Sequence, residues 1–193
     1  MYKRQDLEVV QKETVGKMYY YKYPIEGEEG QFIHIATTRP ETMFGDTAVA
    51  VSKENEKLKH LIGKNAILPI VNRPIPIVGD EHADPEKGTG AVKITPAHDF
   101  NDFEVGKRHD LPMIRVLTYD GHMTGAADKA AVDAEKAAGR AAADEPDVLD
   151  CGKYAGMTAL EARKAILADL EACGALKETE PLTHDVGTCY RCH

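Results

Sequence analysis

Between residues 18 and 116 the chain is a series of short runs rich in β-branched residues, and clusters of turn-forming residues separate one run from the next. Strands of this length and spacing are typical of a twisted antiparallel sheet or barrel, whereas a helical bundle needs apolar residues at every third or fourth position. We therefore predict a β core for the domain. The clearest predicted strands are residues 31–36, 48–51, 66–71, 75–78 and 90–95.

Two of the predicted strands contain a proline, which limits how they can pair. Pro69 and Pro76 have no backbone N–H to donate to a neighbouring strand, and prolines within sheets are confined largely to edge strands and bulges. We therefore expect both strands to lie at an edge of a sheet or to be kinked, with a hairpin turn through residues 72–74 between them.

Three helices are predicted outside this β core. Carboxylates at the start of residues 99–109 would complement the positive end of a helix, and residues 158–161 have the capping-box pattern that opens another, which Gly174 would end. Residues 126–143 contain ten alanines in 18 positions, which favours a helix by propensity but supplies few side chains to bury. We expect this helix to be peripheral and exposed, within an alanine-rich insertion over residues 122–147.

The length of the chain limits the number of domains, and its net charge limits the kinds of ligand that it can bind. With 193 residues and no internal repeat or long linker, the chain is expected to form a single domain over residues 1–193, as a monomer. The 32 acidic and 24 basic residues give a net charge of −8, which argues against a protein whose affinity comes from neutralising many nucleic-acid phosphates at once. No apolar run is long enough for a membrane span or a signal peptide, so we expect a cytoplasmic protein with no membrane partner.

Hydroxyl residues are distributed unevenly, and this limits the catalytic chemistry. The only serine, Ser52, lies outside the glycine pattern of a nucleophile elbow, which excludes an ordinary serine hydrolase. Threonines gather instead where the first predicted strand leaves the sheet. Each hydroxyl there could cap a turn, but the number of polar side chains in one loop favours a binding site. The polar residues of this loop are Thr37, Thr38, Arg39, Glu41, Thr42 and Thr47.

A second polar cluster follows the last predicted strand. Because side chains alternate along a strand, Lys93 and Thr95 lie on the same face of this strand. The Lys93 side chain either extends into solvent or forms part of a site. Asp99 begins the next helix, either as its N-cap or as a group that binds an ammonium, and Asp102 shares its helix face. His98, Asp99 and Asp102 could also ligate a metal, but no second histidine stands at helical spacing, and the nearby lysine would repel a cation.

The four cysteines are too few and too unevenly spaced for a disulfide scaffold, so we expect reduced thiols. Cys189 and Cys192 have the Cys-x-x-Cys spacing of a zinc knuckle and lie in a return segment, residues 184–193, that we interpret as truncated. Structural zinc takes four ligands, and together with His193 this segment supplies three. We therefore predict no metal in this chain, with zinc at Cys189 and Cys192 as an alternative that needs ligands from outside the printed sequence.

Together, the two polar motifs resemble the editing insertion, connective polypeptide 1, of class I aminoacyl-tRNA synthetases for branched aliphatic amino acids. The similarity rests on Thr-Thr-Arg-Pro-Glu-Thr-Met at residues 37–43 with Gly-Asp-Thr-Ala-Val-Ala-Val at 45–51, and on Gly-Thr-Gly-Ala-Val-Lys-Ile-Thr-Pro-Ala-His-Asp at 88–99. Both motifs look most like the valyl type, with the isoleucyl and leucyl types as alternatives. The resemblance implies an α+β fold with a twisted antiparallel β-barrel core and peripheral helices.

This resemblance also implies what the chain does and what it lacks. The signatures His-Ile-Gly-His and Lys-Met-Ser-Lys-Ser are absent, so the chain is not expected to ligate an amino acid, and ATP and Mg²⁺ belong to the parent synthetase. The implied reaction is hydrolysis of threonine from mischarged tRNA(Val) by a positioned water, with no cofactor. The implied partners are the threonine-charged acceptor end of tRNA(Val) and the rest of the synthetase. A non-catalytic module that only binds the acceptor end is the alternative.

Site roles are carried over from the family residue by residue. Asp99 is expected to bind the α-ammonium of the aminoacyl group, and Arg39 to contact the terminal adenosine or its phosphate. The threonine hydroxyl would be read by Lys93, Thr95 and Asp102, which also organise the attacking water. The implied catalytic residues are Asp99, Thr95, Lys93 and Thr42. The implied substrate-binding residues are Thr37, Thr38, Arg39, Glu41, His98 and Asp102, of which the glutamate and the histidine are also candidate general bases.

Overall fold

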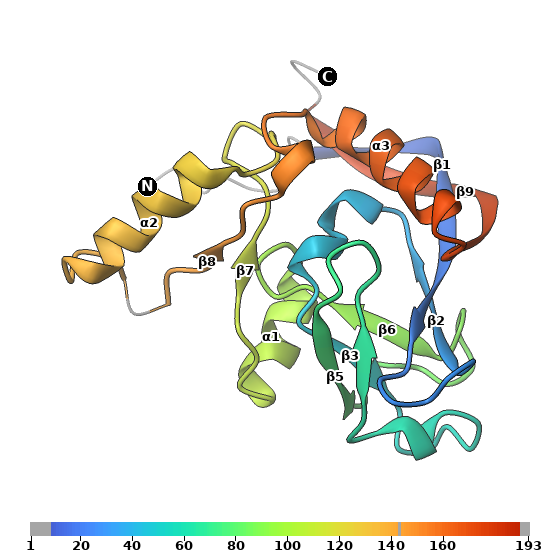
Figure 1. Ribbon diagram of the computed structural model, residues 1–193. Helices are drawn as coiled ribbons and strands as arrows, with labels where there is room; N and C mark the ends of the chain where they lie inside the picture. Colours follow the sequence, from blue (N-terminus) through green and yellow to red (C-terminus); the bar gives the residue numbers. More distant parts are fainter. Residues whose placement is uncertain (1–8, 143, 190–193) are drawn as a thin grey trace, which may run out of the picture.

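The computed structural model describes residues 9–142 and 144–189, and its strands form three sheets. The first sheet is a long ribbon of β1 (Val9–Pro24) and β9 (Leu176–Cys189), with β2 (Phe32–Thr37) on the other side of β1. Figure 1 shows this ribbon at one edge of the molecule, where β1 and β9 run side by side. The sequence analysis predicted β2 but neither long strand, because most of the ribbon is exposed and polar and no apolar run marks it.

The second sheet holds the other predicted strands. In the order β4-β5-β3-β6, it contains β4 (Asn65–Ile67), β5 (Pro74–Gly79), β3 (Ala48–Val51) and β6 (Ala91–Ile94). The predicted hairpin is confirmed, since β4 pairs antiparallel with β5. The expectation of an edge position is wrong for Pro76, because β5 lies between β4 and β3. Its missing N–H is tolerated there because β3 pairs with β5 only from Ile77 onward.

The predicted antiparallel barrel is wrong for the described part of the chain. Closure would require every strand to pair on both sides, whereas β4 and β6 end the second sheet and β2 and β9 end the first. One isolated bridge, between Ile25 and Ala66, connects these two sheets. Two strand pairs are also parallel, β3 with β5, and β7 (Ile114–Arg115) with β8 (Asp147–Val148). The fold is therefore mixed α and β with open sheets.

The three predicted helices are confirmed, with shorter bounds. α1 (Phe100–Arg108) begins after Asp99, whose carboxylate accepts two backbone N–H groups of the first turn. α2 (Ala126–Ala137) projects from the body in Figure 1 and buries none of its residues, as its alanine content predicts. α3 (Ala159–Ala172) is followed by Gly174 at a φ of 70°, a left-handed conformation that favours glycine. Among the residues described, no helix is long and apolar enough to cross a membrane.

The threonine-rich loop is held inside the fold by α3. The loop forms the 3-10 helix η2 (Pro40–Gly45), every residue of which is buried, and α3 packs against it. The aromatic ring of Phe44 lies 5.2 Å from that of Tyr154. One cluster of buried apolar side chains includes residues of η2, of α3 and of both larger sheets. This loop is therefore fixed on a rigid scaffold, which is what a precise binding site requires.

Replacing Thr158 by alanine is expected to lower the free energy of unfolding by about 1 kcal/mol, the typical contribution of an N-cap. Thr158 Oγ1 accepts the N–H of Glu161, and the Glu161 carboxylate accepts the N–H of Thr158, so the predicted capping box is formed. Urea denaturation measures the change. The exposed Lys164→Ala variant of the same helix is the control, and equal midpoints for the two variants would contradict a capping role.

Candidate functional site

The two polar motifs lie against each other, although Arg39 and His98 are 59 residues apart in the sequence. The N–H of Thr47 donates to the carbonyl oxygen of Ile94 at 2.8 Å, which continues the pairing of β3 with β6 into the loop. The Arg39 guanidinium donates to the carbonyl oxygen of His98 at 3.2 Å. The threonine-rich loop therefore lies against β6 and the segment that follows it.

Two glycines permit this close approach. A Cβ atom on Gly45, at the end of η2, would lie 2.8 Å from the carbonyl oxygen of Ile114 and 3.2 Å from the Thr95 side chain. A Cβ atom on Gly106, in α1, would lie 2.8 Å from the ring of Pro96. A larger residue at Gly45 would push η2 away from β7 and Thr95, and one at Gly106 would push α1 away from Pro96.

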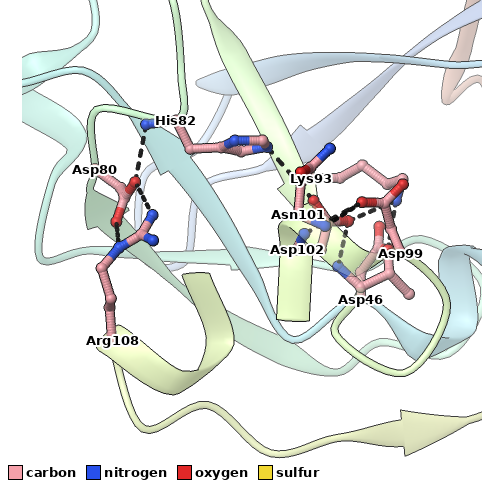
Figure 2. Close-up of polar contacts among 9 residues, drawn as sticks. Asp46, Asp80, His82, Lys93, Asp99, Asn101, Asp102 and Arg108 are labelled. Carbon is pink, nitrogen blue, oxygen red and sulfur yellow. Dashed lines mark hydrogen bonds and ion pairs between the residues drawn. The ribbon is translucent and has the colours of Figure 1, made fainter. Parts of the chain in front are cut away.

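Four side chains form the polar centre of the site (Figure 2). Lys93 Nζ donates to Thr95 Oγ1 at 2.5 Å and lies 3.3 Å from Asp102 Oδ2. The same Asp102 oxygen accepts the backbone N–H of Thr95 at 2.9 Å. On the other side, the Thr95 hydroxyl donates to Asp46 Oδ1 at 2.6 Å. Hydrogen bonds and charge thus connect β6, the first turn of α1 and the end of η2.

Asp46 is a member of this centre to which the sequence analysis gave no role. Its carboxylate is fully buried, and its second oxygen accepts the Tyr23 hydroxyl at 2.7 Å. Burial raises the pKa of Asp46 to about 6, against the opposing effect of Lys93 and of the two hydroxyl donors. Because the folded chain binds this proton more tightly than the unfolded chain, ionisation of Asp46 lowers stability as the pH rises from 3.8 to about 6. The sequence feature that could have drawn attention to Asp46 is its position just before the apolar run that forms β3.

Asp99 lies at a pocket beside this centre. Its side chain is exposed, and Oδ1 caps α1 by accepting the N–H groups of Asn101 and Asp102 at 2.8 and 3.2 Å. The structure thus shows the N-cap role, while binding of an ammonium by Asp99 stays a prediction. The pocket has a volume of about 430 Å³, within the range of small-molecule sites. The residues that line it are Pro96, Ala97, His98, Asp99, Phe100 and Phe103.

The threonines of the first motif stabilise its turn. Thr37 Oγ1 accepts the N–H of Arg39 at 3.1 Å, and the Thr42 hydroxyl donates to the Arg39 carbonyl oxygen at 2.9 Å. Both threonines are buried, whereas Thr38 is half-buried and Arg39 is exposed. Arg39 is therefore the residue of this turn that is best placed to reach a ligand. The predicted roles of Thr37 and Thr38 in substrate binding and of Thr42 in catalysis stay predictions.

Glu41 is held in an ion pair that the sequence analysis did not predict. Its side chain is 2% exposed, and its two oxygens accept the guanidinium of Arg163 at 2.8 and 2.7 Å. Arg39 Nε lies a further 3.7 Å from one of these oxygens. Because α3 supplies Arg163, the pair fixes η2 to this helix. In this geometry Glu41 holds the loop against α3, and its predicted roles in substrate binding and as a general base stay predictions.

His98 lines the pocket, but its ring is already engaged. The Nε2 atom accepts the backbone N–H of Val116 at 3.0 Å. Burial, with the positive charges of Arg39 and Lys93, lowers the pKa of His98 to about 4. The ring is therefore neutral at pH 7 and its single lone pair is occupied. This arrangement does not fit the predicted role of His98 as a general base.

His82 connects the polar centre to a second charged group (Figure 2). Its backbone N–H donates to Asp80 at 2.8 Å, and Asp80 also accepts two hydrogen bonds from Arg108. The His82 ring Nε2 lies 3.6 Å from Asp102 Oδ1. His82 therefore faces the Asp102 oxygen that Lys93 does not contact. The sequence analysis missed this residue because it lies in a turn with no recognisable motif.

Comparison with known proteins identifies the family. A family model described as "Leucyl-tRNA synthetase, editing domain" matches residues 52–171. The chain belongs to this family of synthetase editing domains. The editing domain is 52% identical over 187 residues to a valine--tRNA ligase of Carboxydothermus hydrogenoformans, and 50% identical over 182 residues to that of Lactococcus lactis. These alignments cover 97% and 94% of the chain, which spans 18% of the length of each of these relatives.

A solved structure shares the fold of the editing domain. It is a LeuRS of Agrobacterium radiobacter K84 in a ternary complex with tRNA and LeuAMS, with a TM-score of 0.54 and 19% sequence identity. The match covers 91% of the editing domain and 20% of that chain. At this identity the likeness concerns the fold alone.

In the described part of the editing domain, His, Cys, Asp and Glu side chains do not form a cluster suited to a metal ion. Within residues 9–142 and 144–189, no group of three or more His, Cys, Asp or Glu residues could hold a metal ion. The three residues of the predicted metal alternative each have another partner, as described above. Cys189 lies on β9, while Cys192 and His193 lie outside the described residues. Zinc at the C-terminal cysteines therefore stays an untested alternative.

Proposed function

We propose that the chain hydrolyses the ester that joins threonine to tRNA(Val), as the editing domain of a valyl-tRNA synthetase. The observation that carries this proposal is the ammonium of Lys93, which is held by Thr95 and Asp102 next to the segment that lines the pocket. The identity of about half of the residues to valine--tRNA ligases supports the valyl type over the isoleucyl and leucyl types.

A valyl-tRNA synthetase needs such a site because threonine and valine are nearly isosteric. An apolar pocket cannot strongly reject a ligand that exchanges a methyl for a hydroxyl, and these synthetases, a well-known instance, discriminate by only about 10²-fold in binding. A second, hydrolytic site has to prefer the hydroxyl. The polar centre offers the reverse selectivity because a ligand without a hydroxyl would leave its buried donors and acceptors without partners, at about 1–3 kcal/mol each.

Lys93 and Asp102 are able to read a hydroxyl as both acceptor and donor. The ammonium has three hydrogens, and contacts with Thr95 and Asp102 use two of them. The third hydrogen could be donated to the oxygen of a threonine side chain. Asp102 Oδ1 could accept the hydrogen of the same hydroxyl, since its nearest ring partner, His82, is 3.6 Å away. Valine has neither group, so it would bind less tightly.

The proposed reaction uses a positioned water and no covalent nucleophile. The water oxygen attacks the ester carbonyl carbon, the bond to the ribose oxygen of the terminal adenosine breaks, and that oxygen takes a proton. The products are free threonine and uncharged tRNA. Asp99 would hold the α-ammonium through a charge-assisted contact, which orients the carbonyl toward the water. The chain's one serine, Ser52, is buried and its hydroxyl accepts the N–H of Glu54.

The proposed partner is the acceptor end of tRNA(Val). With a net charge of −8, the chain has little general attraction for phosphate. Exposed Arg39 beside the pocket would supply a local contact with the terminal adenosine or its phosphate. Most of the affinity would then come from the rest of the synthetase, and tRNA would bind the isolated chain weakly.

The proposal is tested by incubating the purified chain with threonyl-tRNA(Val) and, separately, with valyl-tRNA(Val). We expect the chain to release threonine at least about tenfold faster than valine, and EDTA to leave the rate unchanged, because no step uses a metal. Acid precipitation of tRNA carrying a radiolabelled amino acid measures both rates.

Each other outcome points to a different function. Two esters left intact at high protein concentration would favour the non-catalytic binding module. Loss of activity in EDTA would favour a metal-dependent hydrolase that uses His98, Asp99 and Asp102. Release of amino acids from mischarged tRNA(Ile) or tRNA(Leu), with threonyl-tRNA(Val) left intact, would favour the isoleucyl or leucyl type.

A further inference from the structure

Asp46 is a buried carboxylate that no element of the proposed reaction uses. It accepts hydrogen bonds from Thr95 at 2.6 Å and from Tyr23 at 2.7 Å, and none of its surface is exposed. Burying a carboxylate without compensating partners is strongly unfavourable. The turn at this position does not require it, because the backbone N–H of Asp46 closes the turn by donating to the carbonyl oxygen of Met43. The side chain therefore serves another purpose.

Asp46 determines the direction of the Thr95 hydroxyl. A threonine hydroxyl has one hydrogen, and here that hydrogen is donated to the carboxylate of Asp46. Toward Lys93 the same oxygen is therefore an acceptor, and it receives a hydrogen of the ammonium at 2.5 Å. If the hydroxyl turned round, its hydrogen would face the ammonium, which has no lone pair to accept it. The acceptor lone pair that Thr95 presents to Lys93 Nζ thus depends on Asp46 taking the hydroxyl hydrogen.

The surroundings of Asp46 raise the pKa of its carboxyl group, but not above neutral pH. Its pKa is raised to about 6 by burial, while the ammonium of Lys93 lowers it and the Asp102 carboxylate raises it. The Arg73 guanidinium, which precedes β5, donates to the backbone carbonyl oxygen of Asp46 at 2.9 Å. The titratable and charged groups that face Asp46 are Tyr21 and Tyr23 of β1, Lys93 of β6, Asp102 of α1, and Arg73.

We infer that Asp46 is a positioning residue of the editing reaction: it fixes the Thr95 hydroxyl as an acceptor and thereby directs the Lys93 ammonium toward the substrate hydroxyl. This inference rests on the proposed function. Asp46 lies behind Thr95 and touches no substrate, so it acts through Thr95. It is a specificity-determining residue because the ammonium that it positions is the group that would read threonine.

The first test replaces Asp46 by asparagine in the 193-residue chain. The amide has the same shape and can keep the hydrogen bond from Tyr23, but its nitrogen donates to Thr95 and turns that hydroxyl round. We expect single-turnover deacylation of threonyl-tRNA(Val) to fall about 10- to 100-fold at pH 7.5, since small errors of position have effects of this size. The melting temperature is expected to stay equal or to rise, because the buried charge is removed.

Asp169→Asn is the matched control. Asp169 of α3 also accepts a tyrosine hydroxyl, that of Tyr154, but it lies outside the polar centre. Its deacylation rate is expected to equal that of the unaltered chain. A purely structural role for Asp46 predicts the opposite pattern for Asp46→Asn, with a lower melting temperature and an unchanged rate for the folded protein.

Two further readouts examine the path through Thr95. In a Thr95→Val background, Asp46→Asn is expected to slow the reaction less than about threefold, because the group that it orients is gone. Between pH 5 and 7 the unaltered chain and the Asp169→Asn control are both expected to gain activity with a midpoint near pH 6, as Asp46 ionises. Asp46→Asn and Thr95→Val should both lack this midpoint.

The outcomes separate the two proposals. A chain that releases no threonine overturns the proposed function and this inference with it. A chain that releases threonine, with Asp46→Asn matching Asp169→Asn in rate and pH profile, overturns the inference alone. The same holds if Asp46→Asn slows the reaction equally with and without Thr95→Val. If Asp46→Asn does not fold, the pH dependence of the deacylation rate of Thr95→Val tests the inference instead. A midpoint near pH 6 that persists in this variant would overturn the inference.

Discussion

Replacing Asp102 by asparagine is expected to slow the deacylation of threonyl-tRNA(Val) about 100-fold. Asp102 is 4% exposed, and its Oδ2 atom accepts both the N–H of Thr95 and a hydrogen of Lys93. Asparagine can keep the first hydrogen bond but removes the charge that pairs with the ammonium. Leaving one member of a buried charged pair alone is unfavourable by about 2–5 kcal/mol, and 1.4 kcal/mol corresponds to a factor of ten, so the expected loss of rate lies within about 30- to 4000-fold.

Glu104→Gln is the matched control for this prediction. Glu104 lies on the same helix and carries the same charge, but it is exposed. Its removal is expected to leave the rate within about twofold. Denaturation curves for both variants show whether the protein in the assay is folded. A folded Asp102→Asn chain with a rate within threefold of the unaltered chain would show that the polar centre around Lys93 is not the site.

The strands that carry the site could be predicted because each is a short apolar run ended by turn residues. β3 has the predicted bounds, and β6 differs from the prediction by one residue at each end. The ribbon of β1 and β9 could not be predicted in this way, because its strands are largely exposed and pair residues as distant in the sequence as Val9 and Cys189. Barrel closure likewise depends on which sheet edges meet, and no local pattern encodes that.

The residue types of the site could be predicted, whereas their partners could not. Alternation along a strand is a local property, so it correctly placed Lys93 and Thr95 together. Asp46 gains its role from Tyr23 and Thr95, which come from two other parts of the chain. Arg163 has the sequence context of any helical arginine, and only the packing of α3 on η2 gives it a buried partner.

Replacing Glu41 by glutamine is expected to lower the free energy of unfolding by about 3 kcal/mol. The change leaves the Arg163 guanidinium, whose side chain is 27% exposed, without its bidentate carboxylate partner. Removal of one member of a buried ion pair typically lowers stability by about 3–5 kcal/mol, and Arg163 is exposed enough to place the effect at the lower end. A guanidinium keeps its proton at pH 7 even without a carboxylate partner, so deprotonation of Arg163 cannot relieve the uncompensated charge. Urea denaturation at pH 7 measures the effect.

A double-mutant cycle shows whether this loss comes from the pair. Arg163→Gln alone is expected to lower the free energy of unfolding by a similar amount, because it leaves the Glu41 carboxylate buried without this partner. The double variant is expected to lower it by much less than the sum of the two single changes. The exposed pair of Lys129 and Asp133 on α2 is the control, and Asp133→Asn should leave the unfolding midpoint unchanged. An unchanged midpoint for Glu41→Gln together with a collapsed deacylation rate would contradict the ion-pair role and support Glu41 as the general base. Loss of stability with strong coupling to Arg163 would instead show that this glutamate holds the threonine-rich loop against α3.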